Sequence, residues 1–173
     1  VQRALTSVIH VRAESRSCDR AQVGSGWVLS PGRVATNAHV VANADESEPG
    51  SFKDREILRR VPHRFLEGCL IAAHAIGSKH VFVYIRGEYA AEYEVLKTAA
   101  DEVRDADLLG DVTIVLHRGA GAYICGEETA LLDSLEGKRG QPRPRPPFPP
   151  ISGLYGAPTL INASSTFALA TDA

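Results

Sequence analysis

The sequence predicts an α/β protein, in which a parallel or mixed sheet with crossover helices follows a short antiparallel β segment. Three observations predict this class. Two runs of β-branched and apolar residues, 80–86 and 112–116, are separated by a segment with helical periodicity. The first forty or so residues instead consist of short stretches divided by turn residues. Hydrophobic residues make up 44% of the 173 positions, which is enough to bury a core of domain size.

The N-terminal segment has β character. Residues 8–12 alternate between apolar and polar side chains, and residues 26–29 are apolar and bulky. Pro31 and Gly32 mark a turn before residues 33–36. Short strands that are joined by tight turns pair antiparallel, so we expect a small antiparallel meander here.

Residues 62–77 predict an amphipathic helix. Pro62 stands near its start, where a missing N–H is tolerated, and Gly77 stands at its end. Apolar residues recur at spacings of three and four and therefore share one face of the helix. These residues are Phe65, Leu66, Cys69, Leu70, Ala73 and Ile76.

A strand, a helix and a second strand follow in the order expected for a parallel pair. Residues 80–86 and 112–116 are the strands, and the helical segment between them carries apolar residues at spacings of three and four. Strands joined by one helix pair in parallel through a right-handed crossover. We expect both strands to be buried on both faces. The helical positions are Tyr93, Leu96, Ala100 and Val103.

A glycine-rich turn and a shorter helix come next. The helix spans residues 127–135, with Leu131, Leu132 and Leu135 as its apolar stripe. Residues 141–150 hold six of the ten prolines and should therefore run extended.

Composition and charge exclude several function classes. Nineteen basic and 21 acidic residues give a formal net charge of −2, which offers no general attraction to nucleic acid or to an anionic membrane. The longest uncharged run, residues 146–171, is interrupted by proline and glycine, so we expect no direct membrane insertion. The three cysteines and six histidines lack the spacing of a metal site, and we expect no metal. The absence of methionine predicts a fragment, or a processed or engineered piece.

The turn after the second strand is a candidate nucleotide site. Gly119, Gly121 and Gly126 precede a helix, where free backbone N–H groups and the helix dipole favour a phosphate. The spacing is not the Gly-x-Gly-x-x-Gly fingerprint, so an ordinary turn remains an alternative. Glu127 and Glu128 complement the dipole without any ligand. As ligands they would accept ribose hydroxyls and repel a 2′-phosphate, which favours NADH over NADPH.

An acidic segment, residues 43–50, is the second candidate. It reads Asn-Ala-Asp-Glu-Ser-Glu-Pro-Gly. By composition alone, Asp45, Glu46 and Glu48 fit a solvated turn that ends at a proline and a glycine.

Residues 43–162 resemble the flavin- and NADH-binding subunit of respiratory NADH:quinone oxidoreductase and of its soluble-hydrogenase relatives. The resemblance implies a flavoprotein-like core and rests on several blocks that occur in the same order. The matching blocks lie at residues 43–50, 52–57, 62–64, 84–89, 117–131, 135–140 and 146–149.

The resemblance implies which residues lie near the flavin. Asn43, Asp45 and Tyr123 match family positions around FMN. Asn162 matches the first of two asparagines near the FMN phosphate, and Ala163 stands where the second is expected.

The resemblance also implies a dinucleotide side. Glu48 and Glu128 match acids on the NADH side, and Phe148 matches an aromatic residue that stacks on the dinucleotide. Arg145 replaces the more usual lysine. The implied reaction is hydride transfer from NADH to FMN, which requires no catalytic acid or base from the protein. FMN and NAD are the implied cofactors. Other subunits of a respiratory NADH dehydrogenase are the implied partners, and the implied location is cytoplasmic, peripheral to the membrane through those subunits.

The chain departs from the family pattern at several places. The glycine-rich FMN loop of the family is absent before Asn43, and Asp111 alone remains where the family carries a longer insert. The cysteines of an iron–sulfur cluster are also missing. We therefore expect a fragment or chimera of such a subunit, with incomplete chemistry.

Residues 1–42 resemble a different family, the trypsin-like and HtrA-type serine proteases. Residues 23–30 and 34–41 carry this resemblance, and it implies that His39 is an alternative general base. No nucleophile loop of the Gly-x-Ser-Gly-Gly type accompanies it, so a protease remnant is the expectation. Within the tail, residues 164–173 resemble the last strand of such proteases.

These resemblances predict three parts: a protease-like β segment at 1–42, a truncated FMN- and NADH-binding domain at 43–162, and a tail at 163–173. Two further alternatives stay open. One is an inert chimeric domain. The other is a polyproline ligand, because Arg143, Pro146 and Pro149 have the spacing that docks in aromatic grooves.

Overall fold

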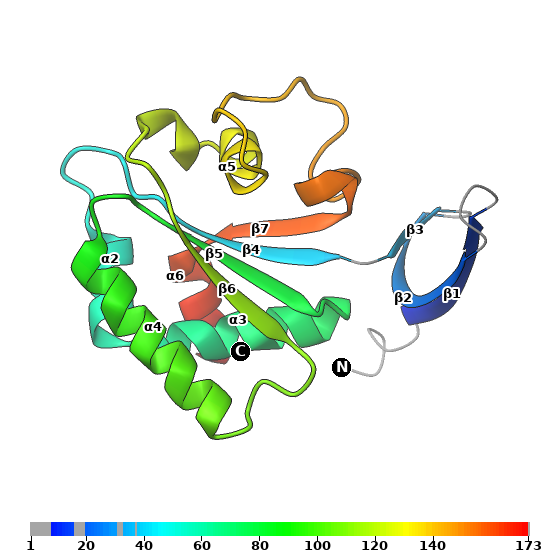
Figure 1. The fold of residues 1–173 in the computed structure, drawn as a ribbon, viewed down its shortest axis with the longest axis horizontal. Coiled ribbons are helices and arrows are strands. Elements are labelled where there is room, and N and C mark those ends of the chain that lie inside the picture. The colour runs from blue at the N-terminus through cyan, green and yellow to red at the C-terminus, as the bar shows by residue number, and fades with distance from the viewer. Residues whose placement is uncertain (1–7, 16–19, 31–32, 37, 173) are drawn as a thin grey trace.

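The computed structural model describes residues 8–15, 20–30, 33–36 and 38–172, with side chains from residue 38 onward (Figure 1). The described strands form two separate sheets, one antiparallel and one parallel. The antiparallel sheet has the order β1-β2-β3 and the parallel sheet has the order β6-β5-β4-β7. An α/β fold with a preceding antiparallel segment is therefore confirmed.

The antiparallel sheet lies in the N-terminal segment, as the sequence predicts. Its strands are β1 (Val8–Ser15), β2 (Arg20–Ser30) and β3 (Arg33–Thr36). Val8 pairs with Trp27 at one end of the β1–β2 ladder. Of the expected β segment, residues 1–7, 16–19, 31–32 and 37 lie outside the described residues.

The parallel sheet is built around one central strand. This strand, β4 (His39–Ala44), pairs in parallel with β5 (His80–Ile85) on one side and with β7 (Thr159–Ala163) on the other. β5 pairs in parallel with β6 (Thr113–Arg118). The expected domain boundary between residues 42 and 43 falls inside β4.

The helices connect these strands and cover both faces of the parallel sheet. The α-helices are α2 (Lys53–Arg60), α3 (Pro62–Ile76), α4 (Ala90–Asp105), α5 (Glu128–Leu135) and α6 (Ser164–Leu169). Short 3-10 turns are η1 (Tyr123–Gly126), η2 (Leu154–Gly156) and η3 (Ala170–Asp172).

Helix α3 follows the predicted limits closely. Pro62 is its first residue, and Gly77 adopts a left-handed conformation at φ 68° directly after its end. The Gly77 N–H donates to carbonyl oxygens of the last turn, which otherwise lack partners. Phe65 and Leu66 are fully buried, so the predicted apolar face is the one that packs on the sheet.

Alternate side chains of β4 enter two different cores. Val40 and Ala42 pack under α2, α3, α4 and α6, whereas Val41 packs on the opposite face with residues of α5, such as Leu131. Figure 1 shows the same three layers, with α2, α3, α4 and α6 on one side of the sheet and α5 with its flanking loops on the other. Residues 40–42 and Ala44 of β4 are buried because both faces of the sheet are covered, whereas His39 and Asn43 are partly exposed.

Two sequence predictions about this region are wrong. β5 is buried on both faces, but β6 is the edge strand of the sheet, and Val115 on it is 37% exposed. The tail does not form a strand: residues 164–172 form α6 and η3, because Phe167 packs against Phe65 of α3. Four elements were not predicted at all, namely β4, α2, β7 and α6.

No helix in the described ranges is long and apolar enough to cross a membrane.

Candidate functional site

A cavity of about 490 Å³ opens at the carboxyl end of β4. Three segments line it: residues 43–54, which begin at the end of β4, residues 123–127 and Ala163 at the end of β7. From β4 the chain first adds β5 and β6 on one side and later adds β7 on the other. The cavity thus lies at the point where the strand order reverses, which is the usual ligand crevice of open parallel sheets.

Asn43 joins two walls of this cavity. Its Nδ2 donates to the carbonyl oxygen of Gly126 at 3.0 Å, and its Oδ1 accepts from the N–H of Asp45 at 3.0 Å. A Cβ at Gly126 would lie 3.2 Å from the Asp45 carbonyl oxygen, so this close approach favours glycine. Two segments that are far apart in sequence, both chosen from sequence as cofactor-binding, therefore meet here.

Asp45 is one of the residues that line the cavity. The hydroxyl of Ser47 donates to Asp45 Oδ1 at 2.7 Å. Burial is the largest influence on Asp45 and raises the pKa of its carboxyl above the ordinary value.

Glu46 was not chosen as a site residue from the sequence, yet it organises the acidic segment. Its carboxylate accepts the N–H of Asp54 at 3.0 Å, at the start of α2, and the hydroxyl of Ser51 at 2.9 Å. Burial alone would raise the Glu46 pKa, but these hydrogen bonds outweigh burial and lower it. In the sequence, Glu46 is only an acid seven residues before the start of α2. Capping motifs lie within a few residues of a helix start, so the sequence does not identify Glu46 as a cap.

Tyr123 and Glu48 meet across the mouth of the cavity. The tyrosine hydroxyl donates to Glu48 Oε2 at 2.6 Å, and this hydrogen bond raises the pKa of the phenol. Tyr123 is 63% exposed, so most of its side chain is accessible to a ligand. The family resemblance assigned Tyr123 to the surroundings of FMN and Glu48 to the NADH side, and the structure brings the two side chains into contact.

Glu127 is the N-cap of α5 and is already engaged. One carboxylate oxygen accepts from the N–H groups of Thr129 and Ala130, each at 2.9 Å. The other accepts from Arg145, which also pairs with Glu128 at 2.9 Å. Burial would raise the Glu127 pKa, but these partners lower it. The helix N–H groups that the sequence offered to a phosphate are thus occupied by the protein's own carboxylate.

The first two glycines of the turn serve packing. Gly121 adopts a positive φ of 82°. A Cβ at Gly119 would lie 2.6 Å from the hydroxyl of Tyr84, a buried residue that hydrogen-bonds Ser134. The turn therefore needs glycine for conformation and close approach, independently of any ligand.

Some of the site residues predicted from the sequence line the cavity, and others do not. Its lining includes the predicted residues Asn43, Asp45, Glu48, Tyr123, Gly126 and Glu127. The predicted residues outside the lining are Gly119, Gly121, Glu128, Arg145, Phe148 and Asn162. Of these, Phe148 is 51% exposed, and Asn162 lies on β7 in register with Ala42.

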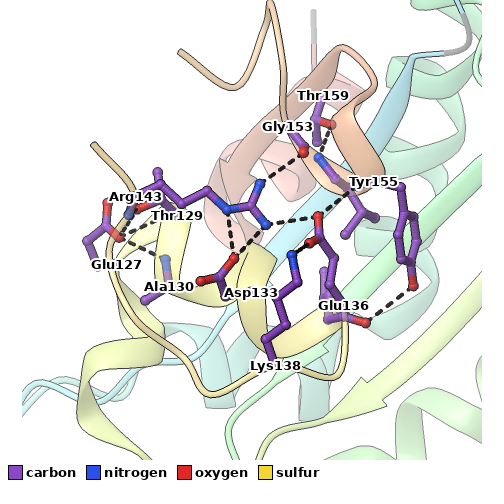
Figure 2. A network of polar contacts seen from close by, with 12 residues as sticks. Glu127, Thr129, Ala130, Asp133, Glu136, Lys138, Arg143, Gly153, Tyr155 and Thr159 are labelled. Atoms are coloured by element: carbon purple, nitrogen blue, oxygen red, sulfur yellow. Dashed lines mark hydrogen bonds and ion pairs between the residues drawn. The ribbon is translucent and has the colours of Figure 1, made fainter. Parts of the chain in front are cut away.

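Arg143 ties the proline-rich strap, residues 141–150, to its neighbours (Figure 2). Its guanidinium donates to Asp133 at 2.7 Å and to the Gly153 carbonyl oxygen at 3.0 Å, and it pairs with Glu136 at 2.8 Å. This arginine is therefore committed inside the protein. Arg143 is therefore not free to contact a partner, as the polyproline-ligand alternative would require.

His39, the general base of the protease alternative, begins β4 and is surrounded by rings. Its ring centroid lies 5.6 Å from that of Phe82 and 6.1 Å from that of His80, and burial followed by the charge of His80 lowers its pKa. Within the part of the chain that the structure describes, its Nδ1 has no hydrogen-bond partner. A triad needs a carboxylate at that atom, so the structure gives the protease hypothesis no support.

Among the residues whose side chains are described, no group of three or more His, Cys, Asp or Glu side chains is placed to hold a metal ion.

Comparison with known proteins gives one consistent family. Residues 20–171 match the family model described as the Nuo51 FMN-binding domain. An NADH-quinone oxidoreductase subunit of Rhodobacter capsulatus is 56% identical over 155 residues, which cover 84% of this chain and 36% of the relative. The corresponding subunit of Rickettsia rickettsii (strain Sheila Smith) is 51% identical over 154 residues, which cover 84% and 37%. The chain thus spans about a third of the length of these relatives.

The fold is also found among solved structures. The chain is similar to part of an NAD+-reducing NiFe hydrogenase in its H2-reduced state, with a TM-score of 0.75 and 42% identity. The match covers 78% of this chain and 24% of the hydrogenase chain. The family match begins at residue 20, so it includes much of the segment that resembles a protease from sequence.

Proposed function

We propose a function from one premise: this chain belongs to the family described as the Nuo51 FMN-binding domain. We propose that the cavity at the carboxyl end of β4 binds FMN and NADH, as a portion of an NADH dehydrogenase subunit. The observation that carries this proposal is the meeting of residues 43–54 and residues 123–127 around one cavity at the strand-order reversal. Bound FMN would supply the hydride acceptor for NADH.

The donor set fits the ring and hydroxyl parts of these cofactors. A cavity of about 490 Å³ is of the size that small-molecule sites commonly have. The carboxylates of Asp45 and Glu48 are acceptors for sugar hydroxyls, and the exposed side chain of Tyr123 offers an aromatic ring on which a flavin could stack.

The same lining fits a phosphate poorly, because the lining itself is negatively charged and would repel an anion. Five carboxylates face a single ammonium group, that of Lys53. Lys53 is itself paired with Asp54 at 2.6 Å and with Glu46 at 3.5 Å. We therefore propose that the phosphates lie outside the lining, and that those of the dinucleotide lie near Arg145, whose guanidinium pairs with Glu127 and Glu128.

A binding experiment with a matched pair of tyrosines tests the proposal. Tyr123 and Tyr155 are each 63% exposed, and Tyr123 is the one that lines the cavity. The purified chain should quench the fluorescence of FMN and co-elute with it. Tyr123→Ala should weaken FMN binding by about tenfold because a stacking surface is lost, whereas Tyr155→Ala should leave it unchanged.

Two results would count against this function. If the chain neither quenches nor co-elutes with FMN, the flavin site does not exist in it. If Tyr155→Ala weakens FMN binding as much as Tyr123→Ala, the flavin binds elsewhere.

We also propose that this unit works within a larger assembly. The relatives named above are subunits of NADH-quinone oxidoreductase, and the chain spans about a third of their length. Partner subunits would then complete the electron path and would hold the chain near the membrane. Co-purification with such subunits, after expression in a cell that contains them, tests this part.

A further inference from the structure

We propose that Arg143 is a positioning residue for the dinucleotide, because it fixes the strap that carries Arg145 and Phe148. This inference rests on the proposed function. Arg143 is outside the cavity lining, so it would act on a ligand only through the residues that follow it. Figure 2 shows its guanidinium between α5 and the turn before β7.

The guanidinium is held rigidly by charge and burial. The side chain of Arg143 is 25% exposed, and its partners Asp133 and Glu136 are 18% and 8% exposed. Two carboxylates in different directions fix both the position and the plane of the guanidinium. A lysine would keep the charge but would lose this fork of donors.

The backbone of Arg143 is tied to the start of α5 as well. Its N–H donates to Thr129 Oγ1 at 2.8 Å, and the same hydroxyl donates to Glu127 Oε2 at 2.6 Å. Two residues later, Arg145 pairs with Glu127 and Glu128. The first half of the strap is thus fixed to the helix start that forms one wall of the cavity.

The chain directly after the strap is held by the same arginine. Arg143 donates to the carbonyl oxygen of Gly153, and its partner Glu136 accepts from the N–H of Tyr155 at 2.8 Å. Phe148 lies between these two anchored ends and is itself 51% exposed. Its location therefore depends on these anchors and on the backbone hydrogen bonds that residues 148 and 149 accept from Ile151, Ser152 and Thr159.

The variant Arg143→Lys tests this role in the full chain. The dissociation constant for NADH should rise by about tenfold because charge-assisted hydrogen bonds that anchor the strap are lost. The dissociation constant for FMN should change by less than about twofold, because the residues proposed near the flavin are anchored through Asn43 and Gly126.

A control variant changes an arginine in the same region without touching the anchor. Arg139 is an exposed arginine four residues earlier, and Arg139→Met should leave both dissociation constants unchanged. Thermal unfolding of each variant separates positioning from folding. Equal weakening of NADH and FMN by Arg143→Lys, or no weakening of either, would overturn the proposal.

A second measurement needs no ligand and keeps the two proposals apart. The backbone amide NMR signals of Arg145 and Phe148 should shift in Arg143→Lys and stay in place in Arg139→Met. Should the unaltered chain fail to bind NADH, the proposed function fails while these signals still decide whether Arg143 positions the strap. Unshifted signals would refute the positioning role directly.

Discussion

Glu46 fixes the conformation of the acidic segment, although the amino-acid composition of this segment predicts only a solvated turn. It is 6% exposed although it belongs to a run of acids. Its carboxylate serves as a remote cap for α2 through the N–H of Asp54 and also holds Ser51. An acidic run of this kind is read from sequence as solvated, but here the charge is stabilised by donors that the fold supplies.

The lowered pKa of Glu46 predicts a pH dependence of stability. The pKa of the Glu46 carboxyl group is lower in the folded state than in the unfolded state. Such a group stabilises the protein at pH values above its unfolded-state pKa, and this stabilisation is lost as the pH falls through its folded-state pKa. Glu46→Gln should lower the free energy of unfolding by about 1–3 kcal/mol at pH 7. The gap to the unaltered protein should shrink between about pH 5 and pH 3.

Urea unfolding at a series of pH values measures that gap. Glu67→Gln, at an exposed glutamate of α3, is the control and should follow the unaltered protein throughout. A Glu46→Gln gap that stays constant down to about pH 3 would mean that the carboxylate charge is not what stabilises the segment.

Adjacent glutamates at the start of α5 have different roles and give a second residue-scale prediction. Glu127 caps two backbone N–H groups, whereas Glu128 pairs with Arg145 at 37% exposure. Glu127→Ala should cost about 1 kcal/mol of stability, as the loss of an N-cap does. Glu128→Ala should cost less than about 0.5 kcal/mol because exposed ion pairs contribute little. Chemical denaturation of both variants measures which one loses more stability. If Glu127 served only to bind a ligand, Glu127→Ala would be no less stable than Glu128→Ala.

At the scale of elements, the crossing of α3 and α6 depends on one glycine. A Cβ at Gly68 would lie 1.8 Å from the carbonyl oxygen of Phe167, a backbone atom that has little room to move. Alanine favours a helix by up to about 1 kcal/mol over glycine, but this contact forces the helices apart. We expect Gly68→Ala to destabilise the protein by about 1–3 kcal/mol net.

The neighbouring exposed position supplies the control for that crossing. Glu67→Ala should change the stability by less than about 0.5 kcal/mol. Both variants are compared by thermal unfolding followed by circular dichroism. An unfolding temperature of Gly68→Ala at or above that of Glu67→Ala would show that helix propensity outweighs the close contact.

At the scale of the whole molecule, the charge pattern predicts an unusual salt dependence. The net charge is only −2, but five carboxylates and one ammonium group line the cavity. Salt screens repulsion between this lining and an anionic ligand. FMN binding should therefore tighten by about two- to fivefold when salt rises from about 0.02 M to 0.2 M.

Riboflavin is the matched control for that titration because it lacks the phosphate. Its affinity should change little over the same salt range, as measured by flavin fluorescence. If FMN binding weakens with salt instead, cations such as Arg145 dominate its electrostatics.

Elements with a strong local pattern were predictable from the sequence. α3, β5, α4 and β6 have clear periodicity, and Gly77 ends α3 as predicted. β4 was hidden because its residues adjoin a turn-like acidic run, and α6 was hidden because serine and threonine begin it. For these short segments, burial under neighbouring elements outweighs local preference.

The sequence by itself determined the parallel α/β class, the helix that follows the glycine turn and the family blocks that nominate Asn43 and Tyr123. Only the tertiary structure decided that residues 43–54 and 123–127 share one cavity, that Glu127 is occupied as a cap and that Arg143 anchors the strap. The physical reason is that periodicity reports short-range burial, whereas these contacts join residues far apart along the chain. Their geometry exists only once strand order brings both segments to the same edge of the sheet.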